Sequence, residues 1–230
     1  MPIILNKRDA HLIEEMDKKD CEQVKLHNTY RQFRSINRLV SRWRGVYTRH
    51  IKPFLSPHHT TSILDIGFGG GDVPVFLHHL AQNDGLKLSI TGIETDERTL
   101  EFTRSLDLPE SITFEVASTT DMIAQAREFD IVISNHLLHH LQDDEIVNLC
   151  REAEQLCQRR VIFNDIERGD LAWAFFTVTG LFYHRSFITK DGLTSIRRSF
   201  TLREIRNILP EEWSVERLLP YRIVATYDTQ

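Results

Sequence analysis

A short apolar segment that runs into a cluster of glycines constrains this chain more than any other feature. Residues 62–66 read Ser-Ile-Leu-Asp-Ile, residues 67–71 contain four glycines, and a helical pattern begins near Asp72. Glycines permit a tight turn and let a ligand approach the backbone without meeting a Cβ atom. The helix that follows offers its N-terminus to a negative group. The segment therefore predicts a buried strand, a ligand-binding turn and a helix.

Strands and helices alternate along the middle of the chain. Short, β-rich apolar segments occupy residues 88–93, 112–117, 129–134 and 160–165, and two more flank Pro220. Strands of this kind separated by helices are typical of a parallel sheet with both faces covered. We therefore expect an α/β fold: a Rossmann-like, mostly parallel sheet of seven strands with helices on both faces.

The N-terminal part of the chain, from residue 7 to about residue 56, is predicted to be helical. Apolar residues recur every three or four positions from Phe33 to Phe54, and most arginines fall on the opposite face. Arg44 is the exception, because at about 100° per residue it falls on the apolar side, and we expect it to point into the site. The expected organisation is an N-terminal helical lid or cap at residues 1–58 and a Rossmann-like domain at residues 59–230, with a lid insertion at about 167–200.

Three carboxylates accompany the predicted turn. Asp65 lies two residues before the first glycine, Asp72 stands where a dinucleotide-binding loop would carry its third glycine, and Glu94 ends the next strand. Loops that bind a pyrophosphate do not favour a carboxylate. A carboxylate suits a ligand with an ammonium or sulfonium group, and an acid at the end of the second strand suits ribose hydroxyls.

Three segments resemble, in order and in spacing, the motifs of class I methyltransferases. They are DIGFGGGD (65–72), GIETDERTL (92–100) and FDIVISNHLLHHL (129–141), within a resemblance that covers about residues 60–165. This resemblance implies a Rossmann-like fold, the cofactor S-adenosyl-L-methionine and the product S-adenosyl-L-homocysteine.

The resemblance also implies which residues bind the cofactor. Asp65, Gly67 and Gly69 would surround the methionine moiety, and Glu94 would hold the ribose, with Thr95 beside the adenine. The family often has a carboxylate near position 118, where this chain has serine, so the adenine contact is less clear. The remaining expected cofactor contacts are Ser118 and Thr119 near the adenine amino group, Asn135 beneath the methionine end, and Phe68, Gly71 and Asp72 of the loop.

The acceptor is expected beyond the carboxyl ends of the strands, where ligands lie in open α/β sheets. His139 and His140 follow the fourth strand, and either is a candidate base because the pKa of histidine is near neutral. No metal centre is expected: His136 and His140 are four residues apart, but no HExxH motif and no cysteine partner accompanies them. The other candidate substrate and lid residues are Tyr30, Arg44, His136, Asp165, Trp173, Phe176 and Arg197.

The flanking segments narrow the acceptor class. TYRQFRSINRLVSRW (29–43), FNDIERGDLAWAFF (163–176) and DGLTSIRRSFT (191–201) resemble a subgroup of small-molecule methyltransferases, some of them associated with polyketide or aromatic-pigment pathways, and more distantly quinone-biosynthesis enzymes. The resemblance implies O- or C-methylation of a hydroxylated aromatic or polyketide-like acceptor.

Two alternatives arise from the N-terminal segment. Between Gln23 and Pro57 it has eight lysines or arginines and no acidic residue, so helix 25–52 is a candidate surface of a nucleic-acid methyltransferase. The segment 25–54 is also a candidate contact of a membrane-associated quinone or lipid methyltransferase. Against nucleic acid, the net charge is −5 and the fourth strand lacks the Asn/Asp-Pro-Pro-Tyr/Phe pattern of amino-methylating nucleic-acid enzymes. We favour an apolar stripe that packs on the sheet domain, with arginines in water.

Composition bears on location. No apolar run reaches the roughly 18 residues of a membrane span, and the first twenty residues become charged too early for a signal peptide. The three cysteines have no metal or disulfide spacing. These features predict a soluble cytoplasmic protein with reduced thiols.

Overall fold

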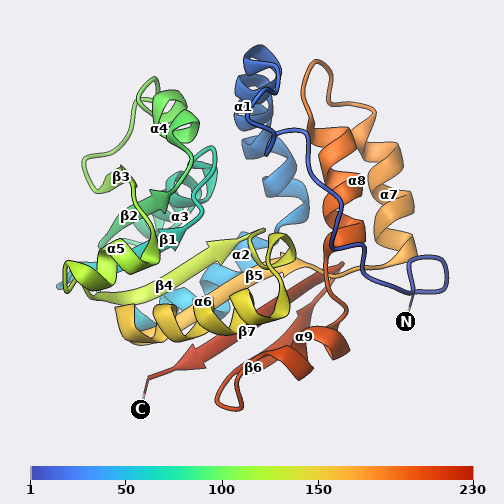
Figure 1. Ribbon diagram of the computed structural model, residues 1–230. Coiled ribbons are helices and arrows are strands. Elements are labelled where there is room, and N and C mark those ends of the chain that lie inside the picture. The colour runs from blue at the N-terminus through green and yellow to red at the C-terminus, as the bar shows by residue number, and fades with distance from the viewer. Residues whose placement is uncertain (1, 230) are drawn as a thin grey trace.

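Seven strands form one sheet in the order β3-β2-β1-β4-β5-β7-β6 in the computed structural model, which describes residues 2–229 (Figure 1). Strand β7 is antiparallel to β5 and to β6, and the other neighbouring strands are parallel. The predicted fold class is thus confirmed. The strands are β1 (Thr61–Ile66), β2 (Leu88–Glu94), β3 (Ile112–Val116), β4 (Phe129–Asn135), β5 (Cys157–Ile166), β6 (Ser214–Leu218) and β7 (Arg222–Asp228).

Helices cover both faces of the sheet. Successive side chains of a strand point to opposite faces, and in this sheet both sets are apolar and need cover. Ile63 packs in a buried cluster with Leu77 of α3, whereas Leu64 packs with Leu149 of α6 on the other face. Both faces are apolar, which explains the nearly continuous apolar runs of the sequence. One face is covered by α2 (Trp43–Val46) and α3 (Asp72–Asn83), and the other by α5 (Thr119–Ala124), α6 (Asp143–Leu156) and α9 (Leu202–Ile208).

The strand order reverses beside β1, where β2 lies on one side and β4 on the other. In open α/β sheets this reversal opens a crevice at the carboxyl ends of the strands. Helix α4 (Glu97–Thr103) follows β2, and its Phe102 packs against Leu26 and Tyr30. The crevice is therefore bounded on one side by the segment after β2.

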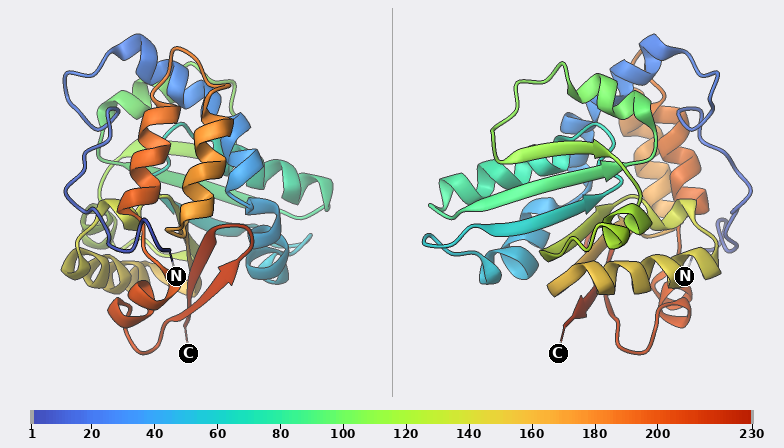
Figure 2. Two further views of the ribbon diagram at one scale, coloured as in Figure 1. Left: turned by 90° about the vertical axis from the view of Figure 1, so that its right-hand side faces the viewer. Right: turned by 60° about the vertical axis from the view of Figure 1, so that its left-hand side comes forward.

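Three helices stand over the carboxyl edge of the sheet (Figures 1 and 2). Their apolar sides form one cluster, in which Ile36 lies against Phe176 and Ile188. Helix α7 contains the apolar segment after β5, and α8 contains the polar segment that follows. The three are α1 (Gln23–Val40), α7 (Asp170–Gly180) and α8 (Ile188–Arg198).

The segment before α1 runs across α7 and α8 as a strap without regular helix, although the sequence predicts helix from residue 7 (Figure 2). Side chains of the two helices bind its backbone. Asp170 accepts hydrogen bonds from the amides of Ile3 and Leu5, at 2.5 and 2.8 Å. Asp191 accepts one from the amide of Glu15 at 2.7 Å.

The predicted N-terminal helix is also broken after α1. Arg42 has a φ of +59°, and the chain then forms α2, a π-helical turn at Tyr47–Ile51 and a short 3₁₀ turn at Lys52–Phe54. Trp43 and Tyr47 are buried against the sheet, in the cluster that includes Ile63. The apolar stripe is therefore inside the protein. Among the helical segments before β1 that the structure describes, α1 is the one that lies over the crevice. No helix within residues 2–229 is long and apolar enough to cross a membrane.

Candidate active site

A cavity of about 520 Å³ lies between the carboxyl edge of the sheet and the helices α1, α7 and α8. Its volume is within the range of about 300–1,000 Å³ that is usual for small-molecule sites. One part is lined by the glycine turn and acidic side chains, and another by apolar side chains of the three helices. The lining includes Asp65, Gly67, Phe68, Gly69, Asp72, Glu94, Asn135, His136, His139, His140, Phe33, Ile36, Phe176 and Tyr221.

The glycine turn after β1 has a backbone that only glycine adopts without strain. Gly67, Gly69 and Gly71 have φ values of +76°, +52° and +73°. The turn also lies directly beneath α1, because a Cβ atom at Gly70 would be 3.1 Å from the carbonyl oxygen of Tyr30. The glycines thus form the floor of the cavity and allow α1 to approach it.

Asp65, at the end of β1, is a buried carboxylate that has no partner. Its side chain is about 1% exposed, and within residues 2–229 neither of its carboxylate oxygens makes a hydrogen bond. Burial raises its pKa well above the usual value, and the nearby charges of Asp72 and Glu94 raise it further. Because an unpaired buried carboxylate is unfavourable, this position suits a ligand that brings a cationic or hydrogen-bond-donating group.

Glu94 and Asp72 line the same cavity. Burial raises the pKa of Glu94, whose Oε1 accepts a hydrogen bond of 2.8 Å from the amide of Thr95. Burial also raises the pKa of Asp72 to about 6, although a hydrogen bond from Asn37 opposes this shift. Three carboxylates therefore surround one end of the cavity, as expected for a ligand with an ammonium group and ribose hydroxyls.

The segment after β4 is held from behind by a buried arginine that the sequence analysis did not single out. The Arg222 guanidinium donates to Asn135 Oδ1 at 3.1 Å and to Asn164 Oδ1 at 3.0 Å, and it contacts His136 Nε2. Burial and the arginine charge keep the pKa of His136 well below its usual value. The signal for Arg222 was its place at the start of an otherwise apolar strand, where a charge needs partners.

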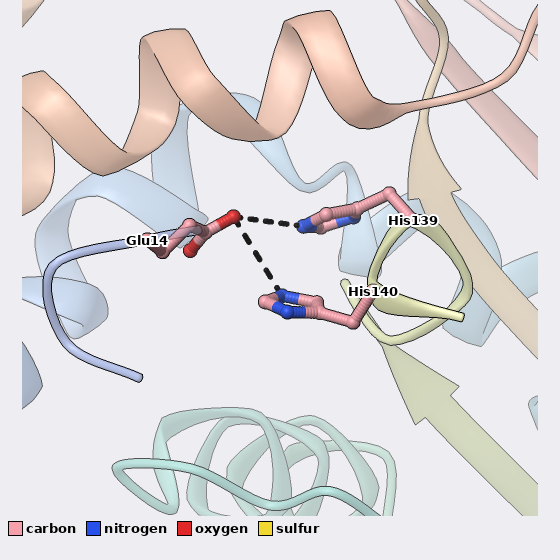
Figure 3. Close-up of side chains that lie close together, drawn as sticks. All are labelled: Glu14, His139 and His140. Atoms are coloured by element: carbon pink, nitrogen blue, oxygen red, sulfur yellow. Dashed lines mark ion pairs between the residues drawn. The ribbon is translucent and has the colours of Figure 1, made fainter. Parts of the chain in front are cut away.

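His139 is enclosed between two carboxylates (Figure 3). Its Nδ1 lies 2.7 Å from Asp165 Oδ1, and its Nε2 lies 3.4 Å from Glu14 Oε1. Burial alone would lower the pKa of His139, but the charge of Asp165, which accepts a hydrogen bond from Nδ1, and the nearby carboxylate of Glu14 raise it to about 9. Both candidate bases line the cavity, but His139 is buried and paired with two carboxylates, whereas the side chain of His140 is partly exposed.

Several residues predicted from the sequence lie outside the cavity. Ser118 caps α5 through Asp121, and Thr119 donates a hydrogen bond to Glu152. Trp173 lies on the outer side of α7, and Arg197 pairs with Asp9 at 2.7 Å. The amide of Thr95 donates a hydrogen bond to Glu94, and Asp165 lies behind His139. Tyr30 faces Phe102 of α4, and Gly71 faces Phe114 of β3.

The reasoning that placed Arg44 on the apolar side of a continuous helix is wrong. The chain leaves the helix at Ser41 and Arg42, so the helical phase of residues before this break does not extend to those after it. Arg44 is exposed, and its guanidinium lies 6.0 Å from the centre of the Phe76 ring. It lines a second, open groove on the outside of α1 and α2, together with Arg31, Arg34, Arg38, Arg42 and Arg49.

Two contributors to the site could not be read from the sequence. Glu14 lies in the strap, in a polar segment of the sequence without periodicity. Its side chain lines the cavity because Asp191 accepts a hydrogen bond from the amide of Glu15, the next residue in the strap. Asn37 lies on the buried side of α1 and bonds to Asp72 at 3.0 Å. A polar residue in an apolar stripe was the only signal for Asn37.

Comparisons with known proteins agree with this geometry. Residues 63–160 match the family described as "Methyltransferase domain". No curated protein sequence matches the chain. Three structurally similar proteins share 12–16% of their sequence with this chain, so the likeness shows the fold.

The first of these is the plantazolicin methyltransferase BpumL, with 12% identity, a TM-score of 0.65, and coverage of 94% of this chain and 93% of that one. Human N-acetylserotonin methyltransferase has 14% identity and a TM-score of 0.63, and the match covers 90% of this chain and 56% of that one. Magnesium protoporphyrin IX methyltransferase from Synechocystis PCC 6803 has 16% identity and a TM-score of 0.53, over 88% and 86% of the two chains.

The family match extends from β1 into β5 and contains the glycine turn, Glu94 and the histidine segment after β4. Residues 63–160 of this chain therefore match the methyltransferase-domain family, and the chain has the fold of the methyltransferase structures compared above.

Proposed function

We propose that the protein methylates an oxygen or carbon atom of a small, hydroxylated aromatic or polyketide-like acceptor. The observation that carries this proposal is the division of the cavity into two chemically different parts. Carboxylates surround the glycine turn, whereas Phe33, Ile36 and Phe176 line the part beneath the helices. A flat apolar molecule is the ligand that an aromatic, enclosed lining favours.

The residues around the turn fit the cofactor. Asp65 would accept hydrogen bonds from the methionine ammonium group, Glu94 would accept them from the ribose, and the glycines leave room for close approach. S-adenosylmethionine supplies an electrophilic methyl group on a sulfonium ion. The chain's own part is to exclude water and to align the acceptor, which are the main sources of rate in a direct displacement.

The acceptor atom would approach from the ends of β4 and β5. Asn135, His136 and His140 line this side of the cavity, and the buried Arg222 holds Asn135 and His136 in place. A hydroxyl acceptor must lose a proton, and His140 is the imidazole at this position that is partly exposed to the cavity. The names of the structurally similar enzymes, which include N-acetylserotonin and magnesium protoporphyrin IX methyltransferases, support a small-molecule acceptor.

Calorimetric titration with S-adenosylhomocysteine tests the cofactor site. We expect micromolar binding by the wild type, a loss of at least tenfold in Asp65→Asn and in Glu94→Gln, and no binding of NAD. Asp130→Asn is the matched control, because this carboxylate lies at the opposite end of the sheet and bonds to Ser62. Tight NAD binding, or equal affinity in all three variants, would contradict the assignment.

An acceptor screen then tests the chemistry. Phenols and enolic polyketides are incubated with the protein and labelled S-adenosylmethionine, and label transfer is followed. We expect transfer to members of these classes, and none to DNA or RNA. Transfer only to nucleic acid would reject the small-molecule proposal in favour of the arginine groove, and that binding would weaken steeply with salt.

A lipid-like acceptor taken from a membrane surface is the second candidate. It rests on an exposed apolar surface at α7, where the side chains of Leu171, Val178 and Leu181, which directly follows the helix, are 61–70% exposed. Phe175 of α7 is 47% exposed and also lines the cavity. Co-sedimentation with anionic vesicles tests it. Binding that is lost in Val178→Ser/Leu181→Ser would support a surface contact through α7, and the absence of wild-type sedimentation would reject it.

A further inference from the structure

Three potential metal ligands from distant parts of the chain meet at the acceptor side of the cavity. Glu14 comes from the strap, and His139 and His140 come from the 3₁₀ turn after β4 (Leu138–His140). The carboxylate and one nitrogen of each imidazole all lie within 4.8 Å of one another (Figure 3). Glu14 and His139 are almost completely buried, and all three residues line the cavity.

The two separations from Glu14 are close to those of a tetrahedral metal site. Glu14 Oε1 lies 3.4 Å from His139 Nε2 and 3.7 Å from His140 Nε2. Ligands that are each about 2.0–2.2 Å from a zinc ion in tetrahedral geometry are about 3.3–3.6 Å apart. The three atoms are therefore placed so that one cation can contact all of them after small side-chain movements.

Each of the three ligands is also held by a second residue in the manner of a metal site. Asp165 Oδ1 lies 2.7 Å from His139 Nδ1, and Asp17 Oδ2 lies 3.2 Å from His140 Nδ1. Metal-binding histidines almost always donate their other ring nitrogen to a carboxylate or carbonyl in this way. The ligating carboxylate is held as well, because Ser195 Oγ donates a hydrogen bond of 2.7 Å to Glu14.

The His139 ring points an unsatisfied atom at this position. Within residues 2–229, its buried Nε2 makes no hydrogen bond of normal geometry, although Glu14 lies near it. The backbone of the turn is fixed from the other side, since the Arg198 guanidinium donates to the carbonyl oxygens of His139 and His140. The turn is thus rigid where its two imidazoles face the cavity.

We propose that Glu14, His139 and His140 bind a divalent transition-metal ion of the Zn²⁺ type, with one coordination position open to the cavity. Two histidines, one glutamate and an open position are the donor set of catalytic zinc sites. An acceptor hydroxyl that occupies the open position would lose its proton to water more readily than in bulk solution, and His140 would then act as a ligand and not as the base. The metal site itself depends on its ligands alone and not on the identity of the acceptor.

The alternative is an ion-pair network, in which protons on the imidazoles hold the two histidines to Glu14. Both arrangements use the same atoms, so metal binding must be measured directly. The full chain is freed of metal with a chelator and titrated with Zn²⁺ by calorimetry in the absence of cofactor. Failure of the methyl-transfer proposal and failure of this one are then observed separately.

Four variants make the test specific. We expect one Zn²⁺ per wild-type chain, and loss of this site in both Glu14→Gln and His140→Asn. His79→Asn is the matched control, because His79 is an exposed histidine on α3 and should keep the wild-type stoichiometry and affinity. Asp17→Asn removes only the carboxylate charge beside His140 Nδ1, and this variant should bind Zn²⁺ about 10- to 100-fold more weakly than the wild type.

Cobalt provides an independent readout of the ligands. Co²⁺ bound by the wild type should show visible absorption of four-coordinate intensity, absent from Glu14→Gln. If Glu14→Gln does not fold, His140→Asn decides alone, because His140 is partly exposed. The proposal is overturned if the wild type binds no Zn²⁺, or if both variants retain one equivalent with unchanged affinity.

Discussion

Asn37 of α1 donates a hydrogen bond of 3.0 Å to the carboxylate of Asp72, the first residue of α3. This bond joins α1 to α3, the helix that follows the glycine turn. The bond and the close approach of Gly70 to Tyr30 bring α1 down onto the turn. The position of α1 and the conformation of the glycine turn therefore depend on each other.

The first prediction concerns this link. Asn37→Ala should lower the free energy of unfolding by about 1.5–3 kcal/mol at pH 8, because a hydrogen bond to a charged group is lost. S-adenosylhomocysteine should also bind more weakly, because the floor of the cavity loses its contact with α1. Urea denaturation and calorimetry measure the two effects. Ser35→Ala, on the exposed side of the same helix, should change neither.

The second prediction concerns pH. Burial raises the pKa of Asp72 from 3.8 to about 6, so the folded state binds its proton more tightly than the unfolded state. The stability from this group is full below pH 3.8 and is lost as the pH rises through about 6. Asp72→Asn should thus be more stable than wild type at pH 8, by up to about 3 kcal/mol, and lose this advantage towards pH 4. A pH-independent difference would show that Asp72 titrates normally.

The third prediction separates strain from contact in the glycine turn. Gly71 and Gly85 have φ values of +73° and +69°, but only at Gly71 would a Cβ atom meet a neighbour, 2.8 Å from Phe114 Cζ. Gly85→Ala should cost about 1–2 kcal/mol of stability from the backbone alone. Gly71→Ala should cost about 1–3 kcal/mol more from overpacking and weaken S-adenosylhomocysteine binding. Equal costs in thermal unfolding would mean that Phe114 moves aside freely.

The fourth prediction concerns the acceptor part of the cavity. A Cβ atom at Gly192 of α8 would overlap the ring of Phe176, which lines the cavity. Gly192→Ala should displace this ring, raise the KM for the acceptor and leave the affinity for S-adenosylhomocysteine unchanged. Gly169→Ala introduces a methyl group with no neighbour within 4 Å and serves as control. Unchanged acceptor kinetics in Gly192→Ala would place the acceptor away from Phe176.

The sequence predicted the sheet well because each central strand is apolar on both faces and is followed by helix or turn signals. It also singled out Asp65 and Glu94, both of which line the cavity, because their spacing from the glycines is local information. The N-terminal segment was harder to interpret, since a stripe that continues from Phe33 to Phe54 hides the break at Arg42. Periodicity reports which residues are buried, but not whether one helix or two bury them.

The rest of the site depends on contacts between distant residues. Ser118 and Thr119 follow β3 as expected, but the start of α5 uses them, as a cap and as a partner of Glu152. Arg222 and Glu14 carry no local signal of their roles, which arise from tertiary packing of the last strand and of the strap. A motif search cannot find such residues.

The strap has a consequence for the order of folding. Glu14 is synthesised well before Ser195, which holds its carboxylate and lies 181 positions later in the chain. Contacts of such large sequence separation form late, since the intervening chain must be ordered first. During synthesis on the ribosome the sheet core from β1 to β5 can form while the cavity is still open to water. The nascent protein therefore gains its closed pocket only when α8 has emerged, and the strap, which is made before the sheet, reaches its place after it.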